Sequence, residues 1–505
     1  MRWRTDFDFG LARLVLFFVV CSLFALSIRT AVDPDYGWHV VNGANVINGS
    51  AFSGRDFYSW TAAGSPWIVH EWVVDAVMAM VHRAGGRTAN SFLAAALGTG
   101  AFCLVAVRLR RNGIGRAAML VTVGIAFLSS VMSLGVRPQV LELLYLAGLL
   151  LFLDEYRARA FDRRTLWLGV AIGGMVWANT HGSFPVIVAV LGITAFGFAL
   201  SRDIRTLDVA VATLIAALST MLNPWGWHVW AFATQSITSK ATSQLIQEWR
   251  PPNLLSGSLL PFVVALALAV IGAMLALRRG ISAQGDDGLL RSPNVSDALI
   301  AVAFAFLAVR SGRHVMLFGV AAAPLIASAI QFGIGRLNIH SSRFGWLTTG
   351  SRAAVVERDR KIIHLMVSLG VLGYVSWASW QIASPERQTA ALSRRYPVGI
   401  VESLRGIDKS SMRILNEYSW GGFLIEHGIL PVFIDGRSEV YGDRQLQRYS
   451  SIVTMAPGWR EQIEALRVNL VLMPRASPLA DSLVKSGWNE VSADKIGRLL
   501  TRPLR

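Results

Sequence analysis

Cysteine and charged residues are scarce in this 505-residue sequence. Its two cysteines, Cys21 and Cys103, both fall inside long apolar runs, so neither a disulfide framework nor a thiolate metal site is indicated. Charged residues make up 16% of the chain and hydrophobic residues 53%, and the mean hydropathy is +0.46. Soluble globular domains carry about 25% charged residues. The composition therefore excludes an ordinary soluble globule and indicates a polytopic membrane protein.

Several familiar motifs are also missing. The sequence contains no P-loop, no GxGxxG after a strand, no HExxH and no obvious internal repeat. The formal net charge is +16, which on its own is compatible with nucleic-acid binding. Much of the arginine, however, lies in short loops between apolar runs, which is typical of the cytoplasmic loops of membrane proteins. We therefore expect membrane lipid, and no nucleic acid, among the partners.

The apolar runs are about 17 to 22 residues long, the length of a helix that crosses a bilayer. The first run is interpreted as a retained anchor, because Arg29 stands where a small residue should precede a signal-peptide cleavage point. The sequence predicts eleven spans, near residues 12–29, 91–107, 117–134, 139–153, 166–178, 185–200, 207–222, 260–277, 297–310, 314–332 and 362–381.

The segment 67–86, WIVHEWVVDAVMAMVHRAGG, resembles a further span. It carries ionisable side chains that are costly in lipid, so we expect an amphipathic helix at the membrane interface. With that choice the basic loops RLRRNGIGR, DEYRARAFDRR and SRDIR face the cytoplasm, as does the N-terminus. Polar residues, Pro, Gly and Trp then gather on the opposite side, in loops 31–90, 135–139, 177–185, 223–252 and 311–314. This asymmetry indicates a cavity open to the outside, although an interface belt of aromatic residues is the plainer interpretation.

The chain changes character after the last predicted span. Strand-like RILN, VFID and VNLVLM alternate there with helix-like WREQIEALR and SPLADSLVKS. We therefore predict an α-helical polytopic membrane protein with a small C-terminal soluble α/β domain. The predicted boundaries are 1–382 for the transmembrane domain, with a first external loop at 31–90, and 383–505 for an extracytoplasmic α/β domain.

Two carboxylates, Asp33 and Asp35, stand where the first span leaves the lipid. A solvated turn that caps a helix is the commonest meaning of Asp-Pro-Asp. If a helix begins at Pro34, Asp35 and His39 share one face of it. A carboxylate there could act as general base on an acceptor hydroxyl or amine, or bind a divalent cation that offsets phosphate charge.

The order of these features resembles the GT-C superfamily of membrane glycosyltransferases. That superfamily includes oligosaccharyltransferase catalytic subunits, protein mannosyltransferases and aminoarabinose transferases. The sequence looks most like a bacterial branch, through DPDYGWHVVNGANVINGS, DFYSWTAAGSPWIVHEW, WANTHGSF, NPWGWHVW, IQEWRPP, GRHVMLF and NEYSWGGFLI with VFIDGRSEVYGD. The tryptophan-tryptophan-aspartate-tyrosine-glycine motif of oligosaccharyltransferases is matched only by SWGGF, which lacks the aspartate, so the resemblance does not extend to sequon recognition.

The resemblance implies transfer of a sugar or glycan from a polyprenyl-phosphate or polyprenyl-diphosphate carrier to an acceptor on the outer face of the bacterial inner membrane. Asp33 or Asp35 then takes the position of the catalytic acid. Some of the families use Mg²⁺ or Mn²⁺ with the acidic loop, bound here by Asp33 and Asp35, and others need no metal. Both alternatives stay open, as do two rival functions: a transporter of a lipid-linked glycan, and a non-catalytic assembly partner.

Cations and imidazoles near the predicted outer helix ends are candidates for binding the donor phosphate or sugar. Their alternative roles are interface anchors, for arginine, and packed core histidines. Glu71 could be a second acid or an exposed residue of the interfacial helix. Asp435 and Arg437 could close the site over an acceptor or form a turn-fixing ion pair. The remaining candidates for substrate binding are His39, Arg137, His181, His228, Arg250, Arg313 and His314.

Overall fold

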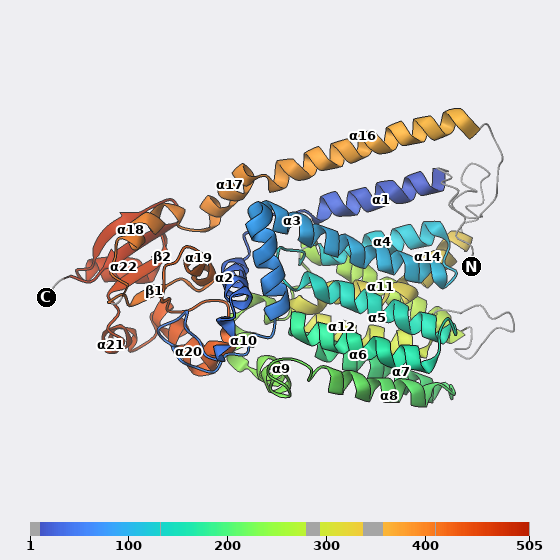
Figure 1. The fold of residues 1–505 in the computed structure, drawn as a ribbon, viewed down its shortest axis with the longest axis horizontal. Helices are drawn as coiled ribbons and strands as arrows, with labels where there is room; N and C mark the ends of the chain where they lie inside the picture. The colour runs from blue at the N-terminus through green and yellow to red at the C-terminus, as the bar shows by residue number, and fades with distance from the viewer. Residues whose placement is uncertain (1–10, 132, 279–292, 337–356, 410, 504–505) are drawn as a thin grey trace.

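The computed structural model describes residues 11–131, 133–278, 293–336, 357–409 and 411–503. Helices dominate this part of the chain. Figure 1 shows a bundle of long helices at one end of the molecule and a smaller region with a β-sheet at the other. The bundle helices are α1 (Leu11–Ser27), α3 (Trp72–Arg111), α4 (Arg116–Ser130), α5 (Val140–Arg157), α6 (Arg163–Thr180), α7 (Pro185–Leu200), α8 (Thr206–Ser219), α11 (Leu260–Arg278), α12 (Val295–Arg310), α13 (Val315–Ala321), α14 (Ala323–Arg336) and α16 (Glu357–Ala383).

By length and composition, three of the described helical stretches are able to cross a membrane. They are Trp72–Arg111, Gly257–Arg278 and Ile363–Arg395. A fourth crossing results if Gly312–Ala321 and Ala323–Arg336 form one span bent by 57°. Pro324 lies in the first turn after this bend, where its missing N–H is tolerated. Shorter apolar helices such as α4 and α7 also lie at predicted spans, so the total of eleven stays a prediction.

The predicted interfacial helix and the predicted second span are two limbs of one element, α3. The backbone leaves helical geometry at Gly85 and Gly86, and Gly86 has φ = 63°, which favours glycine. The first limb runs crosswise to the bundle in Figure 1, whereas the second runs along it. A helix is therefore present within the segment 67–86, from Trp72 to the glycine pair, and its predicted place at the membrane interface stays a prediction.

The sheet of the smaller region is mixed and has four strands: β1 (Ile414–Asn416), β2 (Leu470–Pro474), β3 (Asn489–Ala493) and β4 (Gly497–Thr501). Their order is β1-β2-β4-β3, with β1 and β2 parallel and the other two pairs antiparallel. Helices around the sheet are α17 (Pro385–Arg395), α18 (Val401–Arg405), α19 (Gly421–Glu426), α20 (Ser438–Val453), α21 (Trp459–Ala465) and α22 (Pro478–Lys485). The predicted strands RILN and VNLVLM and both predicted helices are thus confirmed.

The predicted strand VFID, residues 432–435, is wrong. The Asn416 side chain replaces a neighbouring strand here, because its amide accepts from Phe433 N at 2.8 Å and donates to Ile434 O at 2.8 Å. On the other side, Val432 makes an isolated parallel bridge with Ser59 of the first external loop. The run is apolar because it is buried between two segments far apart in sequence, and not because it belongs to the sheet.

The two largest apolar cores of the described residues follow this arrangement. The larger core lies within the helix bundle. The second core contains residues of the sheet region together with Trp38, Tyr58 and Trp67 of the segment that follows α1. The first external loop is therefore packed into the C-terminal region over a shared core.

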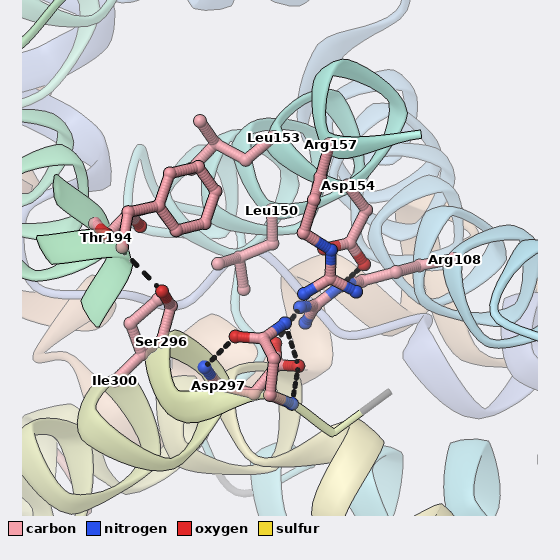
Figure 2. Close-up of a pocket in the computed structure, with 11 residues that line it drawn as sticks. Arg108, Leu150, Leu153, Asp154, Arg157, Thr194, Ser296, Asp297 and Ile300 are labelled. Carbon is pink, nitrogen blue, oxygen red and sulfur yellow. Dashed lines mark hydrogen bonds and ion pairs between the residues drawn. The ribbon is translucent and has the colours of Figure 1, made fainter. Parts of the chain in front are cut away.

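The helix ends remote from the sheet are joined by a buried charge network (Figure 2). Arg108 of α3 contacts Asp154 of α5 at 2.8 Å and Asp297 of α12 at 2.6 Å, and all three side chains are almost inaccessible. A cavity of about 20 Å³ beside them is also lined by Arg157 and Thr194. Such a volume holds about one water molecule. The network holds three helices together at this end.

Candidate active site

The acidic pair lies at the start of α2 (Tyr36–Ile47), as the Pro34 signal predicts. Asp33 Oδ1 accepts from Asp35 N at 3.0 Å, which fixes the turn before the helix. Asp35 Oδ1 accepts from Trp38 Nε1 at 3.0 Å, and Asp35 O accepts from His39 N at 3.1 Å. Asp35 and His39 therefore lie one helical turn apart, as expected.

Arg137 brings a positive charge to the acidic pair. Its Nη1 lies 3.6 Å from Asp33 Oδ2 and 2.5 Å from Glu248 Oε1. Burial and the neighbouring Asp33 carboxylate together raise the pKa of Asp35 to about 7, against the opposing effects of His39, Trp38 and Arg137. A carboxyl group with its pKa raised toward neutrality is suited to act as a general base.

Glu71 lies at the centre of a second cluster. Its carboxylate oxygens are 3.5 Å from His70 Nε2, 3.5 Å from His181 Nε2 and 3.8 Å from His39 Nε2. Burial opposes the charged form of Glu71, but the three histidines outweigh burial and hold its pKa well below the usual range. Burial lowers the pKa of His181 to about 3 despite Glu71. The cluster thus combines an ionised acid with a neutral imidazole.

Asp75 contacts this cluster through His39. It accepts from Asn42 Nδ2 at 2.7 Å, and its Oδ1 lies 2.6 Å from His39 Nδ1. Of the two predicted roles of Glu71, the exposed residue of an interfacial helix is wrong, because its side chain is only 12% exposed. The Asp75 side chain is 0% exposed. Helix α2 covers this limb of α3, and it approaches closely because a Cβ at Gly43 would lie 1.9 Å from Asp75 O.

The remaining outer cations gather around two short 3₁₀ helices, η2 (Gln247–Trp249) and η4 (Gly312–His314). These are joined by the hydrogen bond from Gly312 N to Arg250 O, at 3.0 Å. The Arg313 guanidinium lies 5.1 Å from the centre of the Trp249 ring, and the His314 ring meets the same ring edge-on at 6.4 Å. The structure therefore brings Arg313 and His314 to the segment that carries Glu248, the partner of Arg137.

Glu142 is a buried acid that the sequence analysis missed. It lies in the first turn of α5 and is 2% exposed. Arg313 and Arg137 both act on it electrostatically, and Ser183 hydrogen-bonds to it. Its Oε2 has no hydrogen-bond partner among the described residues. The signal that points to it is an acid at the fourth position of the predicted span 139–153, because lone acids in spans are costly.

His228 and Arg250 both carry exposed side chains. The His228 ring is exposed, its Nδ1 lies 3.0 Å from Trp225 O, and it stacks on Trp227 at 4.2 Å. The Arg250 side chain is also exposed, and its carbonyl oxygen makes the contact to η4. Their proposed roles in substrate binding stay predictions, and the described contacts of His228 are those of an aromatic surface group.

Asp435 and Arg437 form the buried ion pair that was the second of their two predicted roles. Arg437 Nη2 lies 2.6 Å from Asp435 Oδ2, and Arg437 Nη1 lies 2.8 Å from Asp56 Oδ1. The guanidinium is held between the rings of Tyr58 and Trp67, 4.8 and 4.5 Å from their centres. Neither charged side chain is accessible, so the pair fixes a turn and joins the first external loop to the C-terminal region.

The described residues contain no group of three or more His, Cys, Asp and Glu side chains arranged to hold a metal ion. The carboxylates of Asp33 and Asp35 are of the type that Mg²⁺ and Mn²⁺ prefer, and they would supply two of the six ligands Mg²⁺ takes. Substrate phosphate and water oxygens are the usual source of the others. The pair therefore fits a cation held jointly with a phosphate ligand.

No protein-family model matches the chain, and no curated protein matches it. Several solved structures, however, match the chain. The chain is similar to the archaeal oligosaccharyltransferase AglB from Archaeoglobus fulgidus, in complex with an inhibitory peptide and a dolichol-phosphate, with a TM-score of 0.57 and 12% identity over 94% of this chain and 70% of that chain. It is similar to ArnT from Cupriavidus metallidurans bound to undecaprenyl phosphate, with a TM-score of 0.52 and 14% identity over 97% and 98%. The arabinofuranosyltransferase AftD from Mycobacteria gives a TM-score of 0.53 and 15% identity over 97% and 40%.

Proposed function

We propose, from the fold that this multi-pass membrane protein shares over nearly its whole length with GT-C glycosyltransferases, that it transfers a sugar or glycan from a lipid carrier. The donor is a polyprenyl-phosphate or polyprenyl-diphosphate sugar, and the acceptor lies on the extracytoplasmic face of the bacterial inner membrane. Dolichol-phosphate in the AglB structure and undecaprenyl phosphate in the ArnT structure support this class of donor.

The observation that carries the proposal is the position of Asp35 beside Asp33 and Arg137, at the helix end that faces the C-terminal region. A lipid-linked donor keeps its tail in the bilayer and its phosphate at headgroup level. A carboxylate with a pKa near 7 and an arginine at the same place supply a base and a phosphate ligand together.

The chemistry follows from these groups. The Asp35 carboxylate takes the proton of the acceptor hydroxyl or amine while the acceptor atom bonds to the anomeric carbon of the sugar. The bond from that carbon to the carrier phosphate oxygen breaks, and its electron pair leaves with the phosphate. Arg137 and Arg313, which both act on Glu248, stabilise that negative charge. A divalent cation, when bound by Asp33 and Asp35, would offset phosphate charge at the same place.

The buried network of Arg108, Asp154 and Asp297 supports an enzyme over a transporter. Alternating access requires the helix ends on each side to separate in turn. Separating α3 from α5 and α12 would leave buried charges without partners, which costs several kcal/mol per ion. The proposed transfer reaction, in contrast, takes place at the opposite helix ends and does not require the helices joined by Arg108 to separate.

The proposal is tested in cells that lack the protein. Lipid-linked glycans are extracted and compared after complementation with the wild type, with Asp33→Asn, with Asp35→Asn, or with Asp481→Asn as a control in an exposed acid of α22. We expect one lipid-linked species to accumulate without the protein and with Asp35→Asn, and to disappear with the wild type and Asp481→Asn. An unchanged set of lipid-linked glycans in the deletion strain would overturn the proposal.

A further inference from the structure

Glycines of the C-terminal region are packed directly against the acidic turn. A Cβ added to Gly436 would lie 1.7 Å from Asp35 Oδ1, the same oxygen that accepts from Trp38. A Cβ added to Gly422 would lie 2.2 Å from Pro34 O, and one added to Gly37 would lie 2.1 Å from Gly422 O. These distances are shorter than real Cβ contacts, so backbone oxygens leave no room for a side chain at Gly422 and Gly37, whereas one at Gly436 would require the Asp35 side chain to move.

Close approach, and not backbone conformation, explains these glycines. The glycines with positive φ in the described chain include Gly428 and Gly442 but none of the three that meet the acidic turn. Alanine could therefore adopt the backbone conformation of Gly436 without strain. The three atoms nearest to a Cβ at Gly436 all belong to the carboxylate of Asp35.

Buried contacts prevent the turn that carries Gly436 from moving away from Asp35. Asp435 on one side and Arg437 on the other form the buried ion pair, and Asp435 Oδ1 also accepts from Arg437 N at 2.9 Å. Asp56 holds Arg437 from the first external loop. A group added at Gly436 would therefore displace Asp35 and not the turn.

We propose that the Asp435-Gly436-Arg437 turn and Gly422 are positioning residues. In this proposal the C-terminal region packs against the Asp35 side chain on one side and restricts its conformation. The turn fixes the side-chain conformation in which Asp35 Oδ1 faces Trp38 Nε1. The catalytic importance of this role rests on the proposed function, whereas the contact between Gly436 and Asp35 does not depend on it. The C-terminal region therefore takes part in the geometry of the reacting carboxylate, in addition to covering the site.

A double-mutant cycle tests the contact without reference to activity. The variants are Gly436→Ala, Asp35→Ala and the combination of both, purified from membranes and unfolded thermally. Overpacking should lower the apparent Tm of Gly436→Ala by about 2 °C or more in the wild-type background. The same substitution should lower it by less than half as much in the Asp35→Ala background, because the carboxylate is gone. Equal losses in both backgrounds would overturn the proposal.

The control is Gly406→Ala, where the nearest atom to the added Cβ is Ser403 O at 3.9 Å, an ordinary contact. It should give the same small change in both backgrounds. If Gly436→Ala does not fold at all, recovery of folded protein in the double variant supports the contact, and failure of both variants contradicts it.

Transfer from a lipid-linked donor is measured in parallel. Gly436→Ala should lower kcat at least tenfold with little change in the KM for the donor, because the carboxylate is displaced while the cations are kept. Absence of transfer by the wild type would refute the proposed function but would leave the result of the stability cycle intact. A coupled stability cycle with unaltered kcat would show a structural contact without a positioning role.

Discussion

Replacing Arg437 with Met should destabilise the protein far more than removing an ordinary arginine. Arg437 makes two hydrogen bonds to Asp435, at 2.9 and 2.6 Å, and one to Asp56, at 2.8 Å. All three side chains are 0% exposed. Methionine fills much of the same space, so the main effect is that two buried carboxylates lose their counter-charge.

The magnitude follows from this burial. Removing one partner of a buried ion pair costs about 3–5 kcal/mol, compared with a total stability of about 5–15 kcal/mol for most domains. The exposed pair of Arg405 and Glu402, whose side chains are 54% and 83% exposed, should contribute less than about 1 kcal/mol. Arg405→Met is therefore the matched control.

The assay is thermal unfolding followed by tryptophan fluorescence. We expect a large drop in the apparent Tm for Arg437→Met and almost none for Arg405→Met. If Arg437→Met and Arg405→Met lose the same amount, the buried pair does not join the first external loop to the C-terminal region.

Two further predictions concern α2 and the sidedness of the chain. Burial alone would lower the pKa of His39, but Asp75 and Glu71 raise it to about 9. The protonated form therefore stabilises the fold fully below the usual value of 6.5, and this contribution is lost as the pH rises through about 9. The apparent Tm of the wild type should fall more steeply between these pH values than that of His39→Asn, and equal slopes would contradict the assignment. In a chain whose native cysteines are replaced, Ser50→Cys and Ser486→Cys should react with an impermeant maleimide from the extracytoplasmic side, whereas Ala160→Cys should not; labelling of all three from one side would disprove the topology.

Local patterns in the sequence predict much of the fold. Long apolar runs identify α4, α5, α7 and α11 because a helix in lipid must satisfy its own backbone. The strands β1 and β2 and the helices α21 and α22 are also found, from their apolar periodicity. The start of α2 after Pro34 follows from the same kind of local signal.

The parts that could not be predicted depend on contacts between distant segments. VFID has the composition of a strand, but the side chain of Asn416 and the loop residue Ser59 provide its neighbours. Asp75 has the pattern of an exposed residue and is buried by α2. Asp56 has no local signal at all, because its partner Arg437 lies 381 residues away in sequence. Of the acidic site, the sequence indicates Asp33 and Asp35 but gives no sign of the glycines that hold them.

In the proposed reaction, Asp35 removes a proton from the acceptor during transfer from a lipid-linked sugar. The most direct measurement is product formation by the purified protein in membranes, with a labelled polyprenyl-phosphate sugar and the acceptor-containing envelope fraction. We predict transfer by the wild type and by the Asp481→Asn control, and a loss of at least a hundredfold for Asp35→Asn at equal amounts of folded protein. Product formed by Asp35→Asn at the wild-type rate would contradict the account.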